Sequence, residues 1–133
     1  MNVKKLVLAW VVGFVVMFLL AGLWHMVVAS SLYGEGTVDP VMGLIAAGYA
    51  VLALLMSYAY PIGFKGGSAI SEGLRFGALI GLVWVLPHSL VMTGVEGGEM
   101  GILFIDAGWH IVEQGVGGIL IALIYGSGDS DAE

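Results

Sequence analysis

Five ionisable side chains interrupt the most apolar stretches of this sequence, and they include all three of its histidines. They are His25, His88, Asp106, His110 and Glu113. Imidazole and carboxylate groups bind divalent transition metals, and imidazole also passes protons near neutral pH. An ionisable group inside a membrane-spanning stretch is costly to bury and marks a functional site by default. The five residues are therefore the candidate site, if the stretches that contain them are membrane spans.

The composition favours a membrane protein. Of the 133 residues, 59% are hydrophobic and only 11% are charged, whereas about one quarter of the residues in soluble domains are charged. The net charge of −6 argues against nucleic acid as a partner, because phosphate binding needs a basic surface. The chain has no cysteine, so disulfides, thiolate metal sites and cysteine nucleophiles are excluded.

Four apolar runs are predicted to be membrane-spanning helices, at about residues 6–29, 40–60, 73–92 and 102–125. Each is close to the ~20 residues that cross a bilayer, and their short connections require antiparallel neighbours. The predicted fold is all-α, a four-helix transmembrane bundle with up-down-up-down topology. One integral membrane domain would occupy residues 1–126, followed by an acidic disordered tail at 127–133.

The basic residues predict the orientation. All of them lie before the first run or around the connection between the second and third: Lys4, Lys5, Lys65 and Arg75. Basic residues collect on the cytoplasmic side, so we expect a multi-pass inner-membrane protein of the cell with both termini in the cytoplasm. The first run is longer than the apolar core of a signal peptide, and we expect it to be retained as a helix.

Three of the candidate residues share one face of the fourth predicted helix. Asp106, His110, Glu113 and Gly117 are spaced by four, three and four residues, which forms a single stripe at 3.6 residues per turn. In the predicted topology, Asp106 and His110 lie one to two turns below the outer surface, and Glu113 lies one turn deeper. The stripe therefore places two carboxylates and an imidazole in the outer half of the bilayer.

The other two histidines are predicted to face this stripe. His25 and His88 each lie four residues before the outer end of their runs. Gly73, Gly77 and Gly81 form a small-residue repeat that should approach a neighbouring helix closely, and His88 follows on the same side. We expect the histidines and carboxylates to converge in one outward-facing pocket. The glycines also predict a contact with a second copy or with a larger membrane complex, besides the lipid bilayer itself.

A metal ion or haem is the chemistry that this residue set favours. Three imidazoles with two carboxylates suit Zn²⁺, Fe²⁺, Mn²⁺ or Cu²⁺, which makes all five residues candidate metal ligands. Alternatively, His25 and His88 lie at matching depth and would ligate haem b between two helices.

Other roles remain open. Buried His, Asp and Glu residues also mark proton or ion paths, as in a component of a coupled transporter. The chain would otherwise be an accessory or assembly subunit of a larger complex, with polar residues that satisfy one another. His25 and His110 each follow a tryptophan, a combination that also suits interface anchoring. No nucleophile elbow, phosphate loop or dinucleotide fingerprint is present, and no residue is assigned a catalytic role.

Two segments resemble small bacterial four-helix membrane proteins whose domains have no known function. They are Gly73-Leu-Arg-Phe-Gly-Ala-Leu-Ile-Gly81 and Ile105-Asp-Ala-Gly-Trp109, in about half of the chain. The sequence departs from that pattern at Pro87-His88-Ser89 and at His110, where those proteins often have a Tyr-Asp-Leu-Thr-like segment and a small residue. The resemblance implies a four-span architecture and no particular activity.

Overall fold

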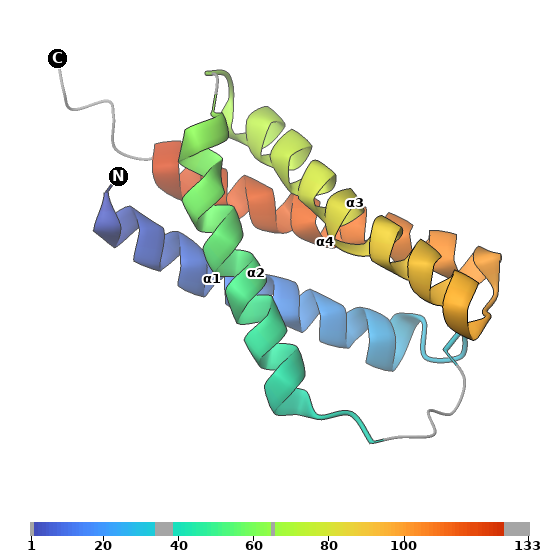
Figure 1. Ribbon diagram of the computed structural model, residues 1–133. Helices are drawn as coiled ribbons and strands as arrows, with labels where there is room; N and C mark the ends of the chain where they lie inside the picture. Colours follow the sequence, from blue (N-terminus) through green and yellow to red (C-terminus); the bar gives the residue numbers. More distant parts are fainter. Residues whose placement is uncertain (1, 34–38, 65, 127–133) are drawn as a thin grey trace, which may run out of the picture.

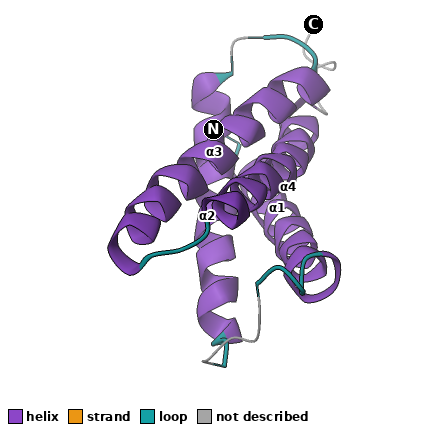
Figure 2. Ribbon diagram, turned by 90° about the vertical axis from the view of Figure 1, so that its right-hand side faces the viewer, coloured by secondary structure: helices purple, strands orange, loops and turns teal. Residues whose placement is uncertain are grey.

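Four long helices make up the fold. The computed structural model describes residues 2–33, 39–64 and 66–126 (Figure 1). The helices are α1 (Val3–Leu23), α2 (Met42–Gly63), α3 (Ala69–Glu96) and α4 (Met100–Gly126), and a short π-helical segment, η1 (Trp24–Val28), continues α1. The described part of the chain contains no strand (Figure 2). The prediction of an all-α four-helix bundle is confirmed.

All four helices are long and apolar enough to cross a membrane, as expected for a multi-pass membrane protein. The predicted spans match these helices to within four residues at each end: the span at 40–60 begins two residues before α2, and α3 extends four residues beyond the third span at each end. The predicted acidic tail at 127–133, part of the connection between α1 and α2 at 34–38, and Lys65 lie outside the described residues.

The helices are antiparallel along the chain. The start of α1, the start of α3 and the end of α4 lie at one end of the bundle (Figure 1), which we call the basic end because Lys4, Lys5 and Arg75 lie there. Helices α3 and α4 run side by side over most of their length, and α2 crosses α1 obliquely. Helix α4 is the most buried of the four, so it offers positions where a polar side chain avoids lipid.

Helices α3 and α4 touch backbone to backbone. A Cβ atom on Gly77 would collide with the carbonyl group of Gln114, and one on Gly81 would collide with the carbonyl of His110. Gly73 makes the same kind of approach one turn away. The predicted close helix contact through this repeat is confirmed, and its neighbour is α4. A contact of these glycines with a second copy or a larger complex stays a prediction, and within the chain α4 covers them.

Apolar side chains from α1, α2 and α4 fill the rest of the interior. The buried members of this core are Ala9, Met17, Leu52, Ala53, Met56, Tyr60, Ile121 and Ala122. The Met17 side chain lies directly against Gly117, where a Cβ atom would have no room. Small residues on α4 thus accept large side chains from α1, and α4 is held from both sides.

The glycine contact gives a first testable prediction. Gly77→Ala should destabilise the fold by about 1–3 kcal/mol, the usual cost of inserting atoms into a packed interface, because the obstacle is backbone that cannot rotate away. The measurement is unfolding in mixed micelles with increasing dodecyl sulfate, followed by circular dichroism. Gly94→Ala is the matched control on the same helix, since a Cβ atom there meets nothing within 4 Å. Equal stability of the two variants would contradict the packing described.

Candidate functional site

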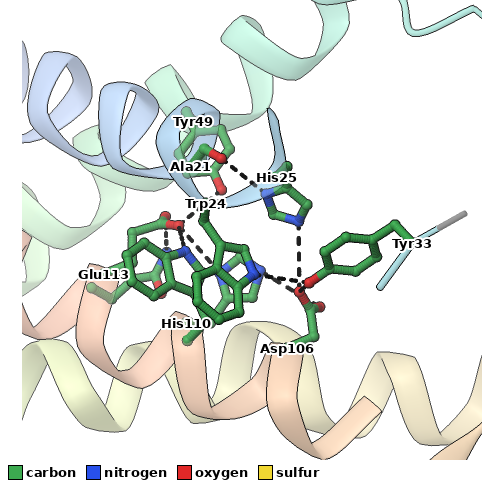
Figure 3. A network of polar contacts seen from close by, with 10 residues as sticks. Ala21, Trp24, His25, Tyr33, Tyr49, Asp106, His110 and Glu113 are labelled. Atoms are coloured by element: carbon green, nitrogen blue, oxygen red, sulfur yellow. Dashed lines mark hydrogen bonds and ion pairs between the residues drawn. The ribbon is translucent and has the colours of Figure 1, made fainter. Parts of the chain in front are cut away.

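Four of the five candidate residues meet in one cluster. His25 comes from η1, and Asp106, His110 and Glu113 come from one face of α4 (Figure 3). The Nε2 atom of His25 lies 3.6 Å from Oδ1 of Asp106, and Oδ2 of Asp106 lies 3.8 Å from Nε2 of His110. The other ring nitrogen of His110, Nδ1, lies 3.9 Å from Oε2 of Glu113. These four residues, the His/carboxylate cluster, form a chain in which imidazoles and carboxylates alternate.

The exposed fraction of the side chain falls steadily from His25 to Glu113 along the His/carboxylate cluster. The side chain of His25 is 40% exposed and that of Asp106 is 23% exposed. The side chain of His110 is 8% exposed and that of Glu113 is fully buried. The cluster therefore connects the surface of the protein with a carboxyl group in its interior.

A widened helical turn presents His25 to α4. The amide of Ala29 donates to the carbonyl of Trp24, five residues earlier, at 2.8 Å, which is the hydrogen-bond spacing of a π-helix. Nδ1 of His25 lies 3.0 Å from the carbonyl oxygen of Ala21. A carbonyl oxygen only accepts, so Nδ1 carries a proton and Nε2 is the atom that faces Asp106. A single proton at Nε2 or on the carboxylate therefore makes this pair attractive.

Tyr33 covers the surface end of the cluster. Its hydroxyl donates to Oδ1 of Asp106 at 2.7 Å and accepts from the indole nitrogen of Trp24 at 2.9 Å. The Trp24 ring in turn stacks on Trp109 of α4, with ring centres 4.5 Å apart. Burial, and then the hydrogen bond to Asp106, raise the pKa of Tyr33 from 10.0 to about 12. The hydroxyl thus remains a donor to Asp106 at every physiological pH.

Glu113 is held by three hydrogen-bond donors. Its Oε2 atom accepts from the hydroxyl of Tyr49 at 3.3 Å and from the indole nitrogen of Trp109 at 3.0 Å. Its Oε1 atom accepts from the side-chain amide of Gln114 at 2.8 Å. The buried atoms Nδ1 of His110 and Oε1 of Gln114 have no hydrogen-bond partner in the described structure. His110 neighbours Glu113 in the cluster, and Gln114 follows it in sequence. Either atom could accept a hydrogen bond from a protonated Glu113.

Tyr33, Tyr49, Trp109 and Gln114 were not among the predicted site residues. Trp109 precedes Glu113 by four residues on the same helical face, and this spacing is a usable signal. Gln114 is a polar residue in an apolar run. The tyrosines reach the cluster from a loop and from α2, and only the tertiary structure brings them there.

The structure places His88 apart from the cluster. Its side chain is exposed on α3, and no described residue makes a polar contact with it. Helix α3 packs mainly against α4, and it does so on a different face of α4 from the one that meets His25. Helical phase correctly placed Gly81 at a helix contact, but phase does not say which neighbour a face meets. Four of the five predicted ligands thus lie together, and His88 lies exposed on α3.

Among residues 2–33, 39–64 and 66–126, no group of three or more His, Asp or Glu side chains is arranged to hold a metal ion. His25 and His88 are both exposed rather than enclosed around a space for haem. The predicted metal site and the predicted haem pair therefore gain no support from the geometry, and both stay predictions.

No known protein family matches the chain, and no curated protein or solved structure is significantly similar to it. The resemblance to small four-helix bacterial proteins stays a prediction. The function must therefore be argued from the cluster alone.

The environment of Tyr33 predicts a late alkaline transition. Between pH 10 and 12 the folded chain keeps a proton that the unfolded chain has lost, so stability is unaffected below about pH 10 and falls as the pH rises further. Phenolate absorbance, measured as the difference between the native protein and Tyr33→Phe, should place this titration near pH 12. Asp106→Asn should shift it to lower pH, and a transition at pH 10 in the native protein would contradict the described contact.

The donors around Glu113 predict a graded loss of stability. Glu113→Ala leaves three donors without an acceptor, and each unsatisfied buried group costs about 1–3 kcal/mol. Glu113→Gln keeps one carbonyl oxygen of the same shape and should be clearly less damaging. Unfolding in mixed micelles, followed by tryptophan fluorescence because Trp109 is a partner, separates the two variants. If Glu113→Ala were as stable as the native protein, the buried network would not be formed.

Proposed function

We propose that the protein is a proton-binding membrane protein that takes up a proton at His25 and holds it at Glu113. The support is the uninterrupted alternation of imidazole and carboxylate over four residues, with exposure that falls from 40% to zero. Such chains of His, Asp and Glu within spans are typical of proton relays.

His110 is the residue on which this proposal depends most. Its two ring nitrogens face two different carboxylates, Nε2 toward Asp106 and Nδ1 toward Glu113. An imidazole can accept a proton on one nitrogen and release another from the second. The gaps of 3.6 to 3.9 Å exceed hydrogen-bond length, so each transfer needs a small side-chain rotation. Transfer then proceeds stepwise, and the chain conducts only when these side chains move.

The relay ends at Glu113. Toward the basic end, the buried side chains of the described structure are mainly apolar, including Met17, Ala53, Met56 and Ile121. From Glu113 to Ile121 is eight residues of α4, or about 12 Å. A proton on Glu113 therefore returns by the path on which it entered. This one-sided access favours a proton-responsive component over a complete transporter.

The same geometry suggests which side supplies the proton. The cluster opens at the end of the bundle opposite Lys4, Lys5 and Arg75. If the basic end is cytoplasmic, both termini are cytoplasmic and the proton comes from the outer face of an inner membrane. An accessory or assembly subunit of a larger complex could also bind a proton in this way, so that role is compatible with the proposal.

The decisive experiment is infrared difference spectroscopy of the protein in liposomes during pH and deuterium-exchange steps. The native protein should show one buried carboxyl group that is absent in Glu113→Gln. In His110→Asn this band should persist, but its exchange should slow by about 100-fold, the typical contribution of one positioned proton carrier. Unchanged exchange in His110→Asn would reject the relay.

Two further outcomes separate the alternatives. A pH-sensitive dye enclosed in the liposomes should report no proton leak above that of empty liposomes. A leak that Glu113→Gln abolishes would instead favour a transporter component. Elemental analysis should give no stoichiometric metal. A metal retained by the native protein and lost from His110→Asn would show that the cluster binds the metal predicted from the sequence, and the proton proposal would be rejected.

A further inference from the structure

A second candidate site lies at the basic end, away from the His/carboxylate cluster. The end of α2, the start of α3 and the end of α4 come together there (Figure 1), and a cavity of about 500 Å³ opens between them. Its walls include Tyr60, Phe64, Ala69 and Tyr125. This volume lies in the range of small-molecule sites. None of the described residues that line the cavity is charged, so it is suited to a neutral molecule.

Tyr60 supplies the cavity with a hydrogen-bond donor that has no partner. The residue is only 4% exposed, and no described residue forms a hydrogen bond with its hydroxyl. The fully enclosed polar side-chain atoms without a partner in the described structure belong to Ser57, His110 and Gln114. The Tyr60 hydroxyl is not one of them, so it is accessible from the cavity that Tyr60 lines. A buried tyrosine hydroxyl normally has a partner, and a ligand with an acceptor oxygen would provide it.

Aromatic rings surround Tyr60. The ring centres of Phe64, Phe76 and Tyr125 lie 5.5 to 5.9 Å from the centre of its ring. The hydroxyl of Tyr125 already donates to the carbonyl of Ser57 at 2.8 Å, so Tyr125 contributes an aromatic surface but no available donor. The faces of phenyl and phenol rings are electron-rich. They therefore favour a planar ligand whose own ring is electron-poor.

The membrane surroundings restrict the choice of ligand further. Hydrocarbon alone gains little by leaving the bilayer for this cavity, because lipid tails are as apolar as the side chains that line it. Selective binding must come from interactions that lipid tails do not offer. Here those interactions are ring stacking and the hydrogen bond from Tyr60.

We infer that this cavity binds the head group of a membrane quinone, with one carbonyl oxygen that accepts from the Tyr60 hydroxyl. A quinone ring is neutral, planar and electron-poor, its carbonyl oxygens only accept hydrogen bonds, and its apolar tail remains in the bilayer. The ester carbonyl of a phospholipid offers the same acceptor but no ring for the aromatic wall. The inference concerns binding alone, and it does not depend on the proton site proposed at Glu113.

Infrared spectroscopy of the bound quinone tests this inference. The full-length protein in detergent is mixed with a benzoquinone that carries a single isoprenoid unit and is isotopically labelled at its carbonyl carbons. The labelled band should move to lower frequency than in empty micelles. Tyr60→Phe should abolish this shift and weaken binding about fivefold, as expected for one hydrogen bond, while it preserves the aromatic packing. Tyr58→Phe is the matched control on the same helix, since Tyr58 is 51% exposed, and it should change neither quantity.

The contrary outcomes are equally definite. An unshifted band in the native protein would overturn the inference. So would a shift that persists in Tyr60→Phe, or one that Tyr58→Phe abolishes as well. Leu123→Trp enlarges a side chain in the cavity wall and should prevent binding, so unchanged binding by this variant, folded by circular dichroism, would place the quinone elsewhere. Displacement of the quinone by phosphatidylcholine at similar concentration would assign the cavity to a phospholipid and reject the quinone.

Discussion

The backbone contact between α3 and α4 is the constraint on which the rest of the structure depends. In lipid, apolar side chains gain nothing by leaving solvent, so helices associate through close packing. Gly77 lets α3 approach the carbonyl group of Gln114, and this fixes both the rotation and the height of α4. Because α4 contributes Asp106, His110 and Glu113, the geometry of the site follows from a contact made on a neighbouring face of the same helix.

Burial of Glu113 is possible because its neighbours replace the hydration that it loses. Three donors reach its two oxygens, and two of them belong to α4 itself. The third, Tyr49, comes from α2, so the position of α2 across α1 has an electrostatic role as well as a packing role. The aromatic stack of Trp24 from η1 on Trp109 closes the same region. Side chains such as Tyr49 and Trp109 thus both hydrogen-bond the buried carboxyl group of Glu113 and pack the helices together.

Most of the fold could be predicted from the sequence, and about half of the site could. Long apolar runs separated by short glycine-rich connections define four antiparallel helices, since a bilayer permits few alternatives. The stripe on α4 followed from its spacing alone. The exposure of His88 was not predicted, because helical phase places it on the same side as Gly81 but does not show whether a neighbouring helix covers that position. Tyr33 was missed because its role depends on where a connection folds back, which no periodicity records.

The π-helical turn at Trp24–Val28 has a consequence for how this sequence can vary. A turn whose bonded partners are five residues apart in sequence contains one residue more than a regular helix would use over the same height. Removal of one residue there would restore a regular α-helix of almost unchanged length that still crosses the membrane. It would also bring a different side chain to face Asp106. Related chains should therefore tolerate substitutions in this segment far better than deletions, and its length is as much a part of the site as its histidine.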